Sequence, residues 1–287
     1  TILEHQLFAS ERNRKAPPAP VAGQKKQRSA GSMVDYGTPK TLDPTGKALT
    51  IGAWCISEKA GGVVMAHGGP FNGYALVVLR GKPTFMVRSG KQLATATAKI
   101  KVTNKWIHLA GVLAKDKQMR LYVNGELAAE TKAPGLIESV PVQGLQVGAD
   151  DGSAVGDYTT PFPFKGVVDE VRVYHRALNE QEMTKLADWG NEPKDKSLVL
   201  YSGFEKGKAI DDSGNKHLGK LSDVNIVRAK TGQAIHFTGK STPGGGGPGV
   251  EHHWTQDIPI LVRAMAKAGD TLFLIGPPDL VDEEETF

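Results

Sequence analysis

The chain contains a single cysteine, Cys55, among its 287 residues. One thiol excludes an internal disulfide, so the folded state must be stabilised by a buried apolar core. Hydrophobic residues make up 39% of the chain, which is sufficient for a core of that kind. Cys55 lies within the apolar run Leu49–Ile56, which favours a packed side chain over a nucleophile.

Long apolar runs are also missing. No stretch approaches the roughly 18 consecutive apolar residues of a membrane-spanning helix, so we expect no membrane span. The opening Thr1-Ile2-Leu3-Glu4 lacks the composition of a signal peptide, so a signal for export would have to be encoded upstream. The chain ends at Phe287 soon after a strand-like run, and we expect it to be a piece of a longer protein.

The chain carries little net charge for its length. The formal net charge is +4, and the lysines and arginines are scattered rather than gathered into a stripe. Nucleic-acid-binding domains carry a clustered basic patch, so this pattern predicts no nucleic-acid partner. The short basic run Gln24–Ser29 lies in a segment rich in Pro and Gly, which favours a solvated linker.

Catalytic motifs are absent from the sequence. A glycoside hydrolase on a β-sandwich would need two carboxylates on one strand face, in a spacing such as Glu-x-Asp-x-x-Glu, and no such spacing occurs. There is no His-Glu-x-x-His and no Gly-x-Ser-x-Gly. The glycine run Gly244–Gly247 is not followed by Lys-Ser or Lys-Thr, so it is not a phosphate loop. The chain is therefore predicted not to be an enzyme.

Short apolar runs separated by turn signals fill the middle of the chain. Asn124-Gly125 is a strong two-residue hairpin signal, because both central positions of the turn need positive φ. One helix is expected near the end of this region, where Asn179 can cap the first turn and Glu182 completes a capping box. This pattern predicts an all-β fold, a two-sheet antiparallel jelly-roll sandwich with one short helix.

One carboxylate in this region lies within an apolar strand. In Lys165–Tyr174, period-two alternation places Asp169 on the same face as Val167, Val171 and Val173, so Asp169 is expected to be buried. A buried carboxylate is costly unless it accepts hydrogen bonds or meets a cation. Asp169 is therefore either a structural acceptor for nearby backbone N–H groups or a calcium ligand.

Composition divides the chain into several parts. The expected parts are a linker or N-terminal arm (1–32), a jelly roll (33–190), accessory strands (191–241), a flexible Gly-rich linker (242–253) and a strand pair from a further domain (254–287). About 42 residues between Leu198 and Gly239 are too few for an independent fold without disulfides, so the accessory strands must pack on something else.

Segments of the jelly-roll region resemble a known family. Trp106–Val112, Met119–Leu127 and Phe164–Leu178 are similar, in this order, to the laminin-G-like, concanavalin A-like jelly roll of bacterial, planctomycete-like secreted proteins. The resemblance covers roughly Val34 to Trp189. It implies a sandwich that binds a ligand and is exported from a bacterial cell.

The accessory segment departs from the pattern of that family. A segment like Leu198–Gly239 usually precedes the sandwich and supplies its first strands, whereas here it follows. It either opens a second, truncated jelly roll or folds back to complete the first one, and the short length favours folding back. The tail Trp254–Phe287 looks like the edge of a quinone-enzyme-type β-propeller, from which no cofactor residues carry over.

The resemblance also implies a calcium site, because several related sandwiches bind calcium on the rim. The best candidates are Asp150 and Asp151 in the loop Gly148–Ser153, with Asp157 nearby and Asp169 as a further ligand. The alternative is that clustered Asp residues simply cap the turns in which they lie.

A sugar site requires aromatic rings near the loops, beside polar side chains. Phe71, Asn72, Tyr74 and Tyr158 meet that description and are the predicted ligand-binding residues. The predicted function is a non-catalytic recognition module for carbohydrate or protein ligands within a larger protein, secreted, periplasmic or on the cell surface. The alternative is a structural or assembly module that packs against a β-propeller domain or a neighbouring subunit.

Overall fold

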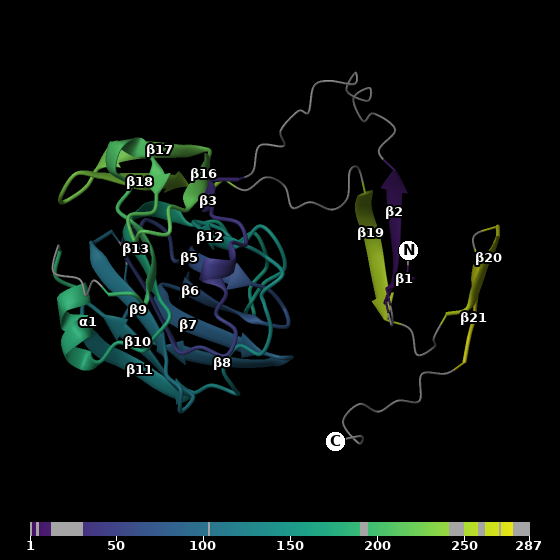
Figure 1. The fold of residues 1–287 in the computed structure, drawn as a ribbon. Helices are drawn as coiled ribbons and strands as arrows, with labels where there is room; N and C mark the ends of the chain where they lie inside the picture. Colours follow the sequence, from purple (N-terminus) through teal and green to yellow (C-terminus); the bar gives the residue numbers. More distant parts are fainter. Residues whose placement is uncertain are drawn as a thin grey trace. The chain divides into compact units, whose positions relative to one another are not determined.

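A computed structural model of the chain describes residues 2–3, 6–12, 31–102, 104–189, 195–240, 250–257, 262–269 and 271–277. The chain forms two compact units (Figure 1). One unit is Arg28–Gly244, and the other combines Thr1–Gln27 with Gly245–Phe287. None of the helices that the structure describes has both the length and the hydropathy needed to cross a membrane.

The unit Arg28–Gly244 consists of two antiparallel eight-stranded sheets that face each other (Figure 1). The predicted all-β sandwich with one short helix is confirmed. The first sheet has the order β11 (Glu126–Lys132), β10 (Gln118–Val123), β9 (Ile107–Leu113), β4 (Leu49–Ser57), β13 (Lys165–Tyr174), β18 (Gln233–Thr238) and β17 (Val224–Arg228), and β14 (Leu198–Ser202) pairs with β13. The second has the order β15 (Ala209–Ile210), β16 (Leu218–Ser222), β3 (Met33–Asp35), β12 (Leu145–Val147), β5 (Gly61–Gly68), β6 (Gly73–Leu79), β7 (Lys82–Ser89) and β8 (Gln92–Thr97).

The main core lies between the sheets, because alternate residues of each strand point inward. Ile51, Leu76, Phe85 and Leu109 are fully buried there, and burial of each such side chain contributes about 1.5–3 kcal/mol. Cys55 is part of this core, and burial raises the pKa of its thiol to about 12. The thiol therefore stays protonated and packed, as its apolar surroundings predict.

The hairpin signal Asn124-Gly125 forms the turn between β10 and β11, and both residues have positive φ, 52° and 82°. The predicted helix is also present, as α1 (Glu180–Leu186). Its capping box is complete, since the Glu182 N–H donates to Asn179 Oδ1 at 3.0 Å and the Asn179 N–H donates to Glu182 Oε2 at 2.9 Å. The predicted hairpin turn and the predicted helix cap are therefore both confirmed.

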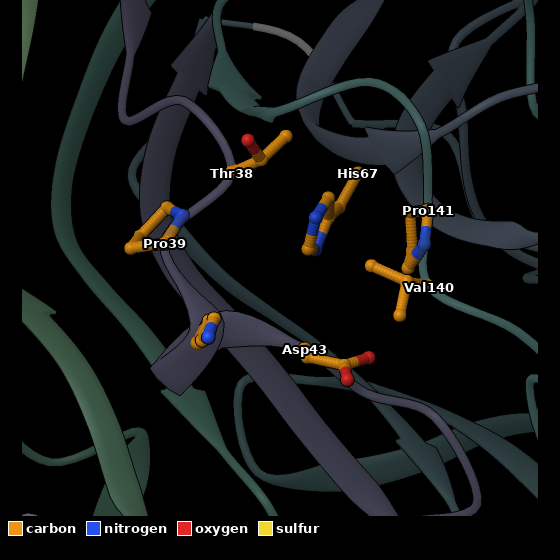
Figure 2. Close-up of a pocket in the computed structure, with 7 residues that line it drawn as sticks. Thr38, Pro39, Asp43, His67, Val140 and Pro141 are labelled. Atoms are coloured by element: carbon orange, nitrogen blue, oxygen red, sulfur yellow. The ribbon is translucent and has the colours of Figure 1, made fainter.

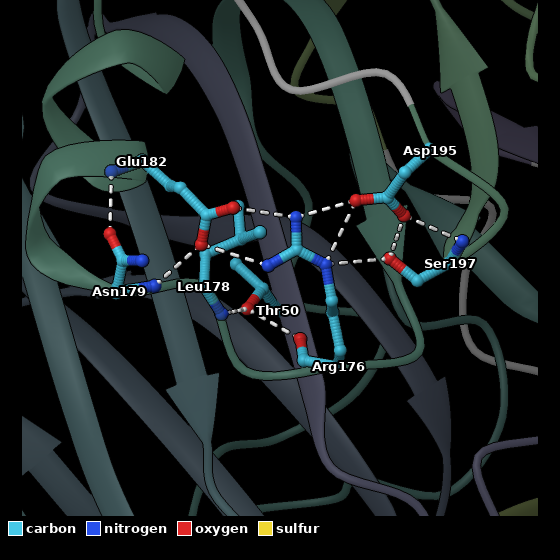
Figure 3. A network of polar contacts seen from close by, with 7 residues as sticks. All are labelled: Thr50, Arg176, Leu178, Asn179, Glu182, Asp195 and Ser197. Carbon is cyan, nitrogen blue, oxygen red and sulfur yellow. Dashed lines mark hydrogen bonds and ion pairs between the residues drawn. The ribbon is translucent and has the colours of Figure 1, made fainter.

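The helix is fixed to the sheet by a network around Arg176 (Figure 3). The guanidinium donates to both carboxylate oxygens of Glu182 at 2.7 and 2.8 Å, and to Asp195 Oδ2 at 2.6 Å. Arg176 Nε also donates to Ser197 Oγ at 3.0 Å. Because Arg176 lies between β13 and α1, and Ser197 immediately precedes β14, one side chain joins three consecutive elements.

The predicted alternation along β13 is correct for Val171 and Val173 but wrong before them, because Val168 shares their core and Val167 and Asp169 do not. The pairing with β4 shifts between Asp169 and Arg172, and Glu170 has a positive φ of 55°. This β-bulge changes the phase of the strand, so Val168 and Val171 both belong to the main core. Asp169 pairs instead with Trp54, whose side chain is not part of that core.

The segment after the helix supplies strands to both sheets. β18 pairs with β13 from Lys165↔Thr238 to Val168↔Ile235, and β17 extends the sheet beyond β18. On the opposite sheet, β16 pairs with β3. These strands therefore cover the edges that β13 and β3 would otherwise leave open.

The second unit contains strands from both ends of the chain. β2 (Gln6–Arg12) lies between β1 (Ile2–Leu3) and β19 (Val250–Asp257) in a three-stranded sheet. The predicted Gly-rich linker therefore does not extend to residue 253, because β-pairing begins at Val250↔Arg12. β20 (Ala264–Ala268) and β21 (Thr271–Ile275) form a hairpin, and their origin in a β-propeller remains a prediction.

Candidate ligand-binding pocket

A pocket of about 320 Å³ lies between the segment that follows β3, the end of β5 and the loop that precedes β12 (Figure 2). The His67 ring lies in its middle, with Thr38 and Pro39 on one side and Val140 and Pro141 on the other. The lining residues come from three separate places along the sequence: Thr38, Pro39, Lys40, Asp43, His67, Val140 and Pro141.

One wall is built by the chain that leaves β3. Asp35 Oδ1 accepts the Gly37 N–H at 2.8 Å, and Gly37 O accepts the Leu145 N–H at 2.9 Å. A Cβ on Gly144 would lie only 2.6 Å from Gly37 O, so the two backbones meet more closely than a side chain would allow. This contact holds the 37–39 turn against the loop that carries Val140 and Pro141.

The turn after the short helix η1 (Lys40–Leu42) fixes Asp43. Asp43 Oδ1 accepts the Thr45 N–H at 2.9 Å and the Thr45 hydroxyl at 2.6 Å, which is an Asx-type turn. Partial burial acts to raise the pKa of Asp43, but these hydrogen bonds and the nearby Lys47 ammonium together lower it. Asp43 is therefore a fixed anion at the edge of the pocket.

His67 is the buried polar group of the pocket. It is 3% exposed, and its Nδ1 lies 3.3 Å from the hydroxyl of Tyr74. Burial lowers the pKa of the imidazole to about 4, so His67 is neutral at physiological pH. A neutral imidazole offers one hydrogen-bond donor and one acceptor.

The pocket therefore combines a carboxylate, a neutral imidazole, the Thr38 hydroxyl and the Lys40 ammonium with apolar walls. A few polar groups in an otherwise apolar concavity are typical of small-ligand sites. The groups can hold a ligand that presents both hydroxyls and an apolar face, as a sugar ring does.

The predicted ligand-binding residues Phe71 and Asn72 lie next to this pocket. Asn72 Nδ2 donates to Ser139 Oγ at 2.9 Å, and its Oδ1 accepts the Glu138 N–H at 3.2 Å. Asn72 thus ties the β5–β6 turn to the residues that precede Val140. Phe71, on the same turn, is 59% exposed, so its ring is available to a ligand or partner.

The prediction for Tyr74 is wrong. Its side chain is fully buried in the main core, so it cannot stack on an external ligand. The residue alternates inward because it is the second residue of β6, not a loop residue. Tyr158 is half-buried, stacks on Phe162 at 5.3 Å, and donates its hydroxyl to Asp150 at 2.7 Å. It packs over the second sheet rather than at the pocket.

The predicted metal ligands do not form a cluster. Asp150 is 2% exposed and accepts the Tyr158 hydroxyl, whereas the Asp157 side chain is 89% exposed and lies 4.0 Å from Arg88. The Asp151 backbone N–H donates to Gln146, and Asp169 lies on β13, where its Oδ1 accepts the Glu170 N–H at 2.8 Å. In the described part of the chain, no group of three or more His, Cys, Asp or Glu could hold a metal ion.

Burial explains the electrostatics of two of these carboxylates. It raises the pKa of Asp150, against the lowering effect of the Tyr158 hydrogen bond. It also raises the pKa of Asp169 to about 8, with a further contribution from the charge of Glu170. The structural reading of Asp169, as an acceptor of a backbone N–H, agrees with its hydrogen bond, and calcium binding remains a prediction.

Sequence reasoning missed most of the pocket. Thr38, Asp43 and Val140 were not singled out, because about 100 residues separate the two walls along the chain. One available signal was the run Asp43-Pro44-Thr45-Gly46, which has the composition of an Asx turn and marks a fixed carboxylate.

A family model covers this fold and site. Laminin_G_3, described as the Concanavalin A-like lectin/glucanases superfamily, matches residues 29–184. The chain belongs to this family. The Laminin_G_3 match includes all the residues that line the pocket and both strands that carry Trp54 and Asp169.

The pentraxin-related protein PTX3 of Mus musculus is 29% identical to this Laminin_G_3 chain over 150 residues, which are 50% of the chain and 39% of the mouse protein. A native heptameric SAP-like pentraxin from Limulus polyphemus is 14% identical, with a TM-score of 0.50, over 74% of this chain and 91% of that chain. A putative carbohydrate binding protein from Bacteroides ovatus is 16% identical, with a TM-score of 0.47, over 74% of this chain and 61% of that chain. At 14% identity, the similarity to the Limulus polyphemus pentraxin establishes the fold alone.

Proposed function

We propose that the unit Arg28–Gly244 is a non-catalytic recognition module that binds a carbohydrate in the pocket around His67. The pocket carries this proposal, because it combines a fixed anion and a neutral imidazole with the apolar faces of Pro39 and Pro141. Sugar hydroxyls pair with such polar groups, while the C–H face of the ring packs on apolar walls. Membership of a family that includes lectins supports the same reading.

The second candidate is a module that contacts protein. Three large apolar side chains are exposed near the pocket: Phe71 at 59%, Val140 at 59% and Val142 at 84%. Exposed apolar groups gathered in one region mark interaction sites more often than isolated ones do. Such a surface suits a protein ligand, a β-propeller domain or a neighbouring subunit. In either case we propose that the module belongs to a larger exported protein.

Two variants separate the candidates. Val140→Arg places a long charged side chain at the mouth of the pocket, whereas Val142→Arg changes the neighbouring apolar surface without lining the pocket. A glycan array is probed with the full chain and both variants, with and without calcium. Saturable glycan binding that Val140→Arg abolishes and Val142→Arg spares supports the carbohydrate site.

If no glycan binds on the array, and both variants weaken a stable complex with a protein, the carbohydrate proposal is contradicted and the protein-contact module is favoured. The comparison with and without calcium tests the predicted metal separately. Glycan binding that is identical in chelator and in calcium contradicts a calcium-dependent site.

A further inference from the structure

Three of the four tryptophans of the chain gather on the outer face of the first sheet. Trp189, which follows α1, stacks on Trp54 of β4 with ring centroids 4.7 Å apart and planes inclined by 19°. Trp106, which precedes β9, makes a T-shaped contact with Trp189, with ring centroids 5.6 Å apart and planes inclined by 84°. Trp106 and Trp189 are half-buried, so aromatic surface remains open to solvent here.

Ring contacts, not hydrogen bonds, hold these indoles among the described residues. The Nε1 atoms of Trp54 and Trp189 are buried and have no hydrogen-bond partner in this part of the chain. His108, whose ring lies 5.5 Å from Trp54, is fully buried, and neither of its ring nitrogens has a partner there either. Burial, with the charge of Arg172, lowers the pKa of His108 to about 3. The His108 ring, which lies beside Trp54, is therefore neutral.

A cation lies over the outermost ring. The Lys230 ammonium, in the exposed turn between β17 and β18, lies 5.6 Å from the centroid of the Trp189 ring. Trp54 already occupies one face of that ring at stacking distance and leaves no room for an ammonium, so Lys230 lies on the other face. An exposed cation–π contact of this kind is worth about 0.5–1 kcal/mol, which is weak enough for a ligand to displace.

We infer that Trp54, Trp106, Trp189 and Lys230 form a second binding surface, distinct from the pocket, that takes an acidic sugar. The C–H face of a pyranose ring stacks on the face of Trp189 over which Lys230 now lies, and the displaced Lys230 ammonium pairs with the carboxylate of a uronic acid. Lys230, whose ammonium lies over the Trp189 ring, supplies the positive charge that complements this carboxylate. Two acidic residues also lie near this surface: the exposed Asp188, which directly precedes Trp189, and Glu205, whose carboxylate a Cβ on Gly232 would meet.

The test uses the full chain and oligogalacturonate, a chain of uronic acids. Its methyl-esterified form keeps the same rings without the charge. Isothermal titration should show saturable binding of the acidic form, and binding of the ester about tenfold weaker. Lys230→Glu should weaken binding of the acid by at least about tenfold, since a paired charge is replaced by a repelling one.

Trp189→Leu keeps an apolar side chain but removes the stacking ring, and it should reduce affinity by a similar factor. Lys91→Glu makes the same charge change on an exposed turn of the second sheet, between β7 and β8, and should leave binding intact. Val140→Arg in the pocket should also leave it intact, which separates this surface from the proposed function of the pocket.

No saturable binding of the acid contradicts the inference, as does equal binding by the wild-type chain and Lys230→Glu. Equal affinity for the acid and its methyl ester removes the role of the charge and overturns the assignment to an acidic sugar. Because Lys230 is exposed, Lys230→Glu should fold normally, so the result does not depend on the stability of the tryptophan variant.

Discussion

The outer faces of the two sheets are covered in different ways. On the first sheet, helix α1 packs Met183 and Leu186 against Tyr122 and Tyr174. On the second, the loop after β12 lays Val155, Tyr158 and Phe162 over residues such as Val77. The helix makes its own backbone hydrogen bonds and is anchored through Arg176, whereas the loop is held by separate contacts, such as the Val63 N–H donating to Phe162 O at 3.0 Å and the Tyr158 hydroxyl donating to Asp150. A sandwich can therefore close its two faces by regular structure on one side and by an ordered loop on the other.

The largest loss of stability is expected from shortening one buried side chain in the helix that covers the first sheet and one in the loop that covers the second. Met183→Ala should lower the free energy of unfolding by about 2–5 kcal/mol, because it leaves a cavity under the helix. Val155→Ala removes fewer atoms from the other face and should cost less. Urea unfolding of both variants measures the two losses, and equal losses would contradict the expected dependence on the volume removed from each face.

The next effect concerns the buried carboxylate on the first sheet. The pKa of Asp169 is about 8 in the folded protein, against about 3.9 in an unfolded chain. Between these values the native state holds a proton that the unfolded chain has released. The stability that results is fully present below about pH 4 and is lost as the pH rises towards 8.

Asp169→Asn should remove this dependence while keeping an acceptor for the Glu170 N–H. Each pH unit in the window is worth about 1.4 kcal/mol, so the wild-type chain should lose about 3 kcal/mol relative to the variant between pH 5 and pH 7. Urea midpoints at the two pH values test this. Parallel pH profiles for the two proteins would show that Asp169 is ionised in the native state.

A smaller effect is expected on the second sheet. Tyr158→Phe removes the hydroxyl that donates to Asp150 and leaves a buried carboxylate oxygen without this donor. The expected cost is about 1–2 kcal/mol. Thermal unfolding of Tyr158→Phe, Asp150→Asn and the double variant Tyr158→Phe/Asp150→Asn checks the pairing. Strictly additive losses would mean that the hydrogen bond contributes nothing of its own.

The smallest expected effect is on the helix cap. Asn179→Ala removes the acceptor of the Glu182 N–H and should lower stability by about 1 kcal/mol. Asn179→Asp keeps the acceptor and serves as the control. If both substitutions cost the same, the cap is not what stabilises the start of α1.

Local signals predicted well wherever neighbouring residues decide the conformation. The Asn179 and Glu182 cap forms as expected, and Asn124-Gly125 makes the β10–β11 turn. The alternation in β13 is interrupted at the bulge around Glu170, where the register with β4 shifts and the partner on the other edge changes from β18 to β14. The extra residue is set by the register of those neighbours, and no periodicity in β13 itself reports it.

The predicted site residues also divide into those whose place local sequence predicts and those whose place depends on distant contacts. Phe71 lies in an exposed turn, as its Gly- and Pro-rich surroundings predict, but Tyr74 belongs to the core three residues later. The pocket could not be found from sequence because its walls, near Thr38 and Val140, come together only through the pairing of β12 with β3 and β5. The metal ligands remain a prediction based on composition.

The sequence by itself determined the class of the fold, the helix and its cap, and the tight turns, because these depend on side-chain alternation and on φ preferences within a few residues. The short length of the segment after the helix already favoured folding back, but its pairing with both sheets depends on the tertiary structure. The tertiary structure alone brought Trp54, Trp106 and Trp189 onto one face and assembled the pocket around His67. Strand partners and cross-sheet contacts are settled by which surfaces can be buried together, and that choice depends on residues far apart in the chain.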